Sequence, residues 1–194
     1  EAKEGGYFSK KYVEGAARFH RAFSYFYLVN LYAKHYDAQT ATTDLGVALT
    51  LEADLNAKIG RSSVEQVYEQ ILEDALKAKD LLENEVEAEY TFRPSKAAAY
   101  ALLARIYLYR GEYTECWKSA RKAREIMDEP SDYNDLEKYD GEDGDPDEGI
   151  EGLPYNNYEY PDIICYKEAS REPNHWQNYN LSDDLMALFD KDTD

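Results

Sequence analysis

Three aspartates at alternate positions have a spacing that favours metal chemistry. Asp143, Asp145 and Asp147 are followed closely by Gly149, and this spacing brings side-chain oxygens together as in calcium loops. The EF-hand pattern, however, requires its glycine one residue earlier, and a closing glutamate where this chain has Pro154. Two interpretations stay open: a solvated acidic loop, which abundant acidic residues favour, and a weak calcium site.

The chain contains no recognisable catalytic set. Its histidines, His20, His35 and His175, lack the HExxH spacing of a metal site, and His20 lies in an aromatic segment typical of a packed side chain. The GxSxG, Walker A and GxGxxG motifs are absent from the sequence. Nothing resembles a nucleophile with its base and its orienting group. We therefore expect a non-catalytic protein without a cofactor.

A segment rich in aromatic and amide side chains, near the C-terminal end, is the candidate binding site. Flat rings pack against the C–H faces of sugars, and amide groups hydrogen-bond to hydroxyls. The predicted glycan-binding residues are Tyr155, Tyr158, His175, Trp176, Asn178 and Tyr179. The alternative is that these rings cover a hydrophobic core beneath a long loop. Trp117, within a predicted helix, is expected to serve packing.

Charge and length limit the class of protein. The 194 residues fit one domain, or one domain with extensions. A formal net charge of −18 repels duplex DNA and anionic membrane surfaces, so nucleic-acid binding is not expected. No apolar run reaches the roughly 18 residues that a membrane-spanning helix needs. Both ends are expected to be cut from a longer protein, because each lies beside a predicted helix and no signal peptide is visible.

Helical periodicity predicts the elements that carry these residues. A first helix is expected from about Ser9 to Lys34, apolar on most sides and therefore buried. A second helix is expected from Ser62, where Ser62 and Glu65 match a capping box. Residues 35–60 show no helical period, and residues 45–49 are expected to lie extended. The apolar stripe of the second helix consists of Val64, Val67, Ile71, Ala75, Ala78 and Leu82.

Residues 94–127 predict two antiparallel helices, starting near Pro94 and joined by a tight turn at Gly111. Large and small side chains alternate so that the two helices can interlock. The pattern consists of Tyr100, Leu103, Ala104 and Tyr107, then Tyr113, Cys116, Ala120 and Ala123. This order resembles one tetratricopeptide unit, a module that builds binding scaffolds.

The composition changes after Pro130. Residues 132–151 are dominated by Asp, Glu and Gly, and an aromatic-rich stretch follows, in which Ile163–Tyr166 is a possible short strand. We expect a tetratricopeptide-like core over 1–127, an irregular acidic and aromatic region over 128–181, and the start of a truncated helix over 182–194. The predicted fold is all-α, a right-handed array of helical hairpins with long irregular loops.

Four stretches, taken in order, are more specific than any one of them alone. They are GAARFHRAFSYFYLVNLY at 15–32, RSSVEQVYEQILEDALKA at 61–78, AAAYALLARIYLYRG at 97–111 and LSDDLMALFD at 181–190. This series resembles the SusD/RagB family of outer-membrane nutrient-binding lipoproteins. The third stretch is the most specific, because it joins the repeat pattern to an alanine-rich lead-in.

The resemblance implies a helical scaffold that packs against a TonB-dependent, SusC-like transporter and displays loops that bind oligosaccharides or other nutrients. It also implies a cell-surface protein, held to the outer membrane by a lipidated N-terminal cysteine. The chain departs from the family in two ways: it has no such cysteine near its start, and it lacks the long C-terminal half that completes the ligand site. The alternatives are an intracellular tetratricopeptide-type scaffold for protein partners and a calcium-dependent adhesion module.

Overall fold

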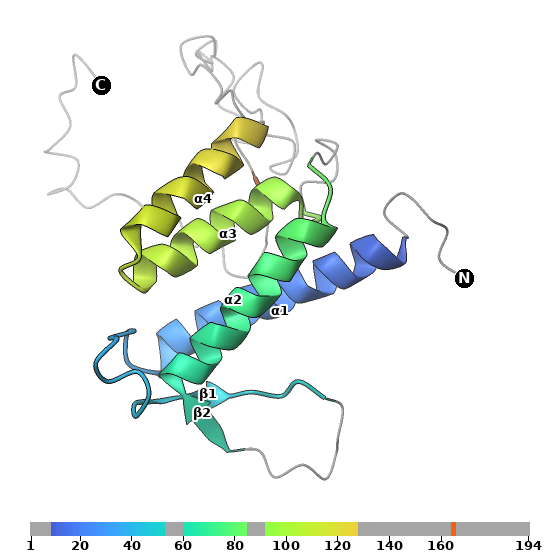
Figure 1. Ribbon diagram of the computed structural model, residues 1–194. Helices are drawn as coiled ribbons and strands as arrows, with labels where there is room; N and C mark the ends of the chain where they lie inside the picture. The colour runs from blue at the N-terminus through green and yellow to red at the C-terminus, as the bar shows by residue number, and fades with distance from the viewer. Residues whose placement is uncertain (1–8, 53–59, 85–91, 128–163, 166–194) are drawn as a thin grey trace, which may run out of the picture.

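The computed structural model describes residues 9–52, 60–84, 92–127 and 164–165. In these ranges the chain forms four helices and one small sheet, so the all-α prediction is confirmed. The elements are α1 (Lys10–Tyr32), β1 (Leu45–Ala48), β2 (Arg61–Ser63), α2 (Val64–Leu81), α3 (Lys96–Tyr109) and α4 (Tyr113–Ile126). Helix α1 packs along α2, α3 packs along α4, and α2 joins the two pairs by its contact with α3 (Figure 1).

One face of α1 is buried, and the opposite face is open to solvent. The helix begins after Ser9, whose hydroxyl accepts a hydrogen bond from the Tyr12 backbone N–H at 3.1 Å. The buried face carries Tyr12, Gly15, Phe19, Ala22, Phe26 and Val29. Leu28, by contrast, is 39% exposed and Tyr32 is 69% exposed. The expectation of burial on most sides is therefore wrong, because within the described ranges the neighbouring elements cover only one face.

Helix α2 buries its predicted stripe completely. Val64, Val67, Ile71, Ala75, Ala78 and Leu82 are all at most 1% exposed. The capping box lies one residue later than predicted: the Ser63 hydroxyl accepts from the Gln66 N–H at 3.2 Å, and Gln66 Oε1 accepts from the Ser63 N–H at 3.0 Å. Helix α2 starts at Val64, so Ser63, the last residue of β2, is the N-cap and Ser62 lies one residue before it.

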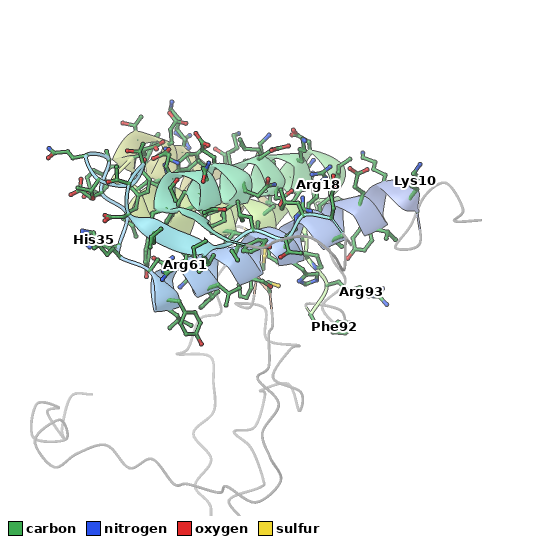
Figure 2. All side chains as sticks on the ribbon, turned by 90° about the horizontal axis from the view of Figure 1, so that it is seen from below. Lys10, Arg18, His35, Arg61, Phe92 and Arg93 are labelled. Carbon is green, nitrogen blue, oxygen red and sulfur yellow. The ribbon has the colours of Figure 1, made fainter. Side chains whose placement is uncertain are left out.

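The unpatterned connection between α1 and α2 contains a strand. Residues 45–48 are extended as predicted and pair antiparallel with Arg61–Ser63. The Arg61 guanidinium donates to the Gly46 carbonyl at 2.6 Å and to the Tyr32 carbonyl at 3.1 Å, which ties the sheet to the end of α1 (Figure 2). A Cβ at Gly46 would lie 2.9 Å from the Ser63 carbonyl oxygen, so this pairing needs glycine. The short polar strand β2 was not predicted, since it has no apolar alternation.

The hairpin of α3 and α4 turns at Gly111, as predicted. This residue has φ of 76°, a conformation that glycine adopts without steric cost. Helix α3 starts after Ser95, whose hydroxyl accepts from the Ala98 N–H at 3.1 Å, so Pro94 precedes the cap and does not open the helix.

Helix α4 packs with a different face from the predicted one. Its buried residues are Ser119 and Ala123, and Cys116 is half-buried. Tyr113 is 71% exposed and Ala120 is exposed, so two of the four predicted contact positions are wrong. Trp117, expected to pack, is 61% exposed, with the Arg121 guanidinium 5.5 Å from its ring. Ser119 was missed because a serine gives no hydrophobic signal.

The core lies where α1, α2 and α3 meet. The alanines at 97, 98 and 99 of α3 are at most 3% exposed, and Tyr68 is fully buried with its hydroxyl 3.1 Å from Asn30 Oδ1. Ile164 and Cys165 are half-buried against this core and form a bend. The strand suggested for residues 163–166 is therefore not found at these two positions. The division at residues 127 and 181 stays a prediction.

Candidate functional site

The predicted glycan-binding residues lie outside the described part of the chain. This holds for Tyr155, Tyr158, His175, Trp176, Asn178 and Tyr179, and equally for Asp143, Asp145 and Asp147. The role of these residues stays a prediction. The described helices show the scaffold, its electrostatics and its open surfaces.

A buried carboxylate joins α1 to α2. Asp74 on α2 has no exposed surface and is bound by two arginines of α1. The Arg21 guanidinium donates to its two oxygens at 2.7 and 2.8 Å, and Arg18 donates at 3.0 Å (Arg18 is labelled in Figure 2). Gln70 adds a fourth hydrogen bond at 3.2 Å. Both oxygens of the Asp74 carboxylate accept two hydrogen bonds each, so the buried charge is fully paired and connects α1 firmly to α2.

These donors set the protonation of Asp74. Burial by itself raises the pKa of a carboxyl group, but the hydrogen bonds from Arg21, Gln70 and Arg18 outweigh it, and the pKa of Asp74 lies below its usual value. Asp74 is therefore ionised at neutral pH. Its partners and its location inside the α1–α2 interface indicate a structural role.

A second polar cluster lies at the turn between α3 and α4. The Tyr36 hydroxyl donates to Glu65 at 2.7 Å, and the Arg110 guanidinium lies 4.7 Å from the Tyr36 ring. Arg110 also donates to Glu112 at 2.6 Å. Burial, together with the hydrogen bond to Glu65, raises the pKa of Tyr36 to about 12. This cluster connects the loop after α1 and the start of α2 to the turn of the α3–α4 hairpin. It therefore fixes the position of this hairpin relative to α1 and α2.

A pocket of about 180 Å³ lies between α2, α3 and α4. Four of its residues are apolar or aromatic, and the others are polar or charged. The lining residues are Leu76, Lys79, Tyr100, Leu103, Tyr107, Glu115, Lys118, Ser119 and Lys122. Burial raises the pKa of the Tyr107 hydroxyl above its ordinary value. Sequence reasoning missed this pocket, because its residues come from three helices and form no motif.

Aromatic and apolar side chains are also exposed on α1 and α3. The Tyr27 hydroxyl accepts a hydrogen bond from Arg105 at 3.3 Å, and Tyr109 lies edge-on to Phe26 with the ring centres 5.1 Å apart. Tyr27 is 40% exposed and Leu31 is 71% exposed. Spacings of four residues, 27 to 31 and 105 to 109, place each pair on one helix face.

In the described ranges, no group of three or more His, Cys, Asp or Glu side chains is arranged to hold a metal ion. The helices of these ranges also include none with the length and hydropathy required to cross a bilayer.

Comparison with known proteins identifies the family. A family model described as "Starch-binding associating with outer membrane" matches residues 1–108, which is more than half of the chain. The chain belongs to the SusD-like family. The match covers α1, α2 and nearly all of α3, and the family is described by binding and not by a reaction, in agreement with the expected absence of catalysis.

Several solved structures share this helical arrangement, and two of the three that follow are described as SusD superfamily proteins. A putative sugar-binding protein from Bacteroides vulgatus is 28% identical, with a TM-score of 0.54, over 60% of this chain and 26% of its own. A SusD superfamily protein from Bacteroides thetaiotaomicron is 31% identical, with a TM-score of 0.53, over 58% of this chain and 25% of its own. Another SusD superfamily protein from Bacteroides vulgatus is 27% identical, with a TM-score of 0.55, over 67% of this chain and 30% of its own.

The chain thus spans between a quarter and a third of the length of these three solved structures. A search of curated proteins finds no match.

Proposed function

We propose that the protein containing residues 1–194 is a glycan-binding component of an outer-membrane nutrient-uptake system. The observation that carries this proposal is the family match over residues 1–108, whose description combines starch binding with the outer membrane. A similar solved structure is described as a putative sugar-binding protein. The protein binds its nutrient without chemical change and passes it on for transport.

In this proposal the described helices hold the binding loops and do not themselves form the main glycan site. Helices α1 and α2 are held together by buried contacts, such as the Asp74 cluster and the fully buried Tyr68 with its hydrogen bond to Asn30. Loops on a rigid scaffold vary in sequence and carry specificity. The aromatic residues at 155–179, above all Trp176 and Tyr179, are proposed to provide the flat rings on which a sugar packs.

A TonB-dependent, SusC-like transporter is the proposed partner, and an N-terminal lipid group is the proposed anchor at the cell surface. The family's association with the outer membrane supports both. Purification of the tagged full-length protein from outer membranes tests the partnership, and a β-barrel transporter is expected to co-purify in comparable amount. Recovery of the protein from the cytoplasm would contradict both parts.

A glycan array probed with the full-length protein tests the function directly. Starch oligosaccharides are included because the family description names starch, and other plant and host glycans cover the remaining possibilities. We expect binding to one glycan class, confirmed by calorimetry, with the ligand recovered unchanged afterwards. A complete lack of glycan binding would overturn the proposal.

The alternative function is a tetratricopeptide-type scaffold that binds protein segments. The exposed apolar side chains of α1 and α4 favour it, among them Leu31 at 71% and Trp117 at 61% exposure. A scaffold of this kind would retain a protein partner after purification and show no affinity for glycans. The family match over residues 1–108 makes the glycan-binding function the better supported of the two.

A further inference from the structure

The pocket between α2, α3 and α4 combines two kinds of surface. Leu76, Tyr100 and Tyr107 contribute apolar and aromatic area, and Leu103, also in the lining, is only 1% exposed. Ser119 and Glu115 contribute hydrogen-bonding groups from α4. A volume of about 180 Å³ is small for a drug-sized ligand but fits a single ring with its substituents.

The charges around the pocket are unusual for so acidic a chain. Lys79, Lys118 and Lys122 line it, and Glu115 is its single acidic lining residue. This local excess of positive charge contrasts with the net charge of −18 of the whole chain. An anion is therefore favoured at this pocket over a neutral ligand of the same shape.

The three lysines have acidic neighbours, but these ion pairs are weak. Lys118 contacts Glu115 at 2.7 Å, and both side chains are about half exposed. Lys122 contacts Glu125, and Lys79 contacts Asp80, each at 2.6 Å, and neither of these acids lines the pocket. The pairs of Lys118 and Lys122 are exposed, and exposed pairs contribute about 0–1 kcal/mol. A bound anion can therefore compete with them for the ammonium groups.

We propose that this pocket is an accessory subsite for one anionic sugar unit, a uronate or a sulfated hexose, of a larger glycan. The proposal rests on the glycan-binding function proposed above and names a ligand class for it. Tyr100, Tyr107 and Leu76 pack against the sugar ring, and Ser119 binds its hydroxyls. Lys118 and Lys122 hold the carboxylate or sulfate group.

The test compares acidic and neutral trisaccharides on the full-length protein by calorimetry. The probes are trigalacturonate, a sulfated galactose trisaccharide and neutral galactotriose. At least one acidic probe is expected to bind roughly tenfold more tightly than the neutral one, and this preference is expected to fall as sodium chloride is raised to about 0.5 M. Equal affinity for all three probes would overturn the proposal.

Three variants localise the binding. The double substitution K118Q/K122Q is expected to weaken binding of the acidic probe roughly tenfold. E115Q removes the one acidic side chain of the lining and is expected to tighten the same binding a few-fold. The control K11Q/K77Q removes the same charge from two exposed lysines outside the pocket and is expected to leave the affinity unchanged.

The outcomes separate this subsite from the general function. Acidic-probe binding that is insensitive to K118Q/K122Q, or equally sensitive to K11Q/K77Q, contradicts the subsite. Binding to neutral glycans alone also contradicts it, and leaves the glycan-binding function in place. A protein that binds neither acidic nor neutral glycans contradicts both proposals.

Discussion

At the scale of single residues, buried polar side chains connect neighbouring helices through hydrogen bonds. Asp74 shows this most clearly, since one carboxylate accepts hydrogen bonds from Arg18, Arg21 and Gln70 in a fully buried position. Buried charges are costly unless they are completely paired, and removal of one partner leaves the others unsatisfied. The consequence of a change at Asp74 should therefore exceed that of a change at an exposed carboxylate.

Asp74→Asn is expected to lower the free energy of unfolding by about 2–3 kcal/mol. The amide removes the charge that the two arginines share, and their partial exposure keeps the loss below that of a fully buried pair. Urea denaturation of the full-length protein measures the change. Glu73→Gln, at the neighbouring exposed carboxylate that pairs with Lys77, is the control and should stay within about 0.5 kcal/mol.

The pH dependence of this contribution follows from the lowered pKa of Asp74. The unfolded carboxyl titrates near pH 3.9, and the folded one titrates lower. The stability that Asp74 contributes is therefore present above about pH 4 and is lost as the pH falls through the folded pKa. The stability difference between wild type and Asp74→Asn should be constant down to about pH 5 and should shrink as the pH falls from there towards pH 3. A difference that stays constant over this range would show that the charge of Asp74 is not responsible.

At the scale of elements, two glycines allow the helices to approach and to turn. Gly15 lies in the buried face of α1, where an added Cβ would lie 2.9 Å from Leu81 Cβ. Gly111 has φ of 76° and no heavy atom within 4 Å of an added Cβ. The first glycine is needed for space, and the second for its backbone conformation.

Gly15→Ala is expected to destabilise the protein by about 1–2 kcal/mol. Alanine is the better helix former, but its methyl group would push α1 away from Leu81 and Leu82. The midpoint of urea unfolding measures the effect. Ala17→Ser, at an exposed position of the same helix, should change stability by no more than about 0.5 kcal/mol. A stabilised Gly15→Ala variant would show that the two helices separate easily.

Gly111→Ala is expected to lower the free energy of unfolding by about 1 kcal/mol, since a positive φ is unfavourable for alanine even where there is room for its methyl group. Thermal unfolding of the variant measures the loss. Gly60→Ala is the matched control: its added Cβ also meets no atom within 4 Å, and its φ is not in the positive range. Equal effects of the two substitutions would disprove the conformational explanation.

At the scale of the whole molecule, the described helices correspond to one part of larger solved structures. The chain covers only 25–30% of the length of the similar solved structures reported above. Within the described ranges, α1 and α4 still have exposed apolar side chains, such as Leu31 and Trp117. Glycan binding should therefore be measured on the complete protein.

Trp176→Ala in the full-length protein is expected to lower glycan affinity at least about tenfold, because a stacked ring is lost from the proposed platform. Isothermal calorimetry with the glycan found on the array measures the change. Trp117→Ala is the control, since Trp117 is exposed on α4 and lies outside the lining of the described pocket. Unchanged affinity of the Trp176 variant would remove this residue from the proposed site.

The sequence by itself determined the local features of this protein. The period of Val64, Val67 and Ile71 predicted the buried stripe of α2, and Gly111 marked the turn. Such features depend on residues close together in the chain, so local patterns are enough to reveal them. The order of four such stretches was also enough to indicate the family.

Only the tertiary structure decided which faces are covered. Trp117 and Leu28 have the residue types of a core and are exposed, whereas Ser119 and Asp74 are polar and buried. Strand β2, which pairs with β1, ends at Ser63, and the capping box lies at Ser63 instead of Ser62. Burial, pairing and the pocket between α2, α3 and α4 all depend on neighbours distant in the chain, and no local periodicity specifies those neighbours.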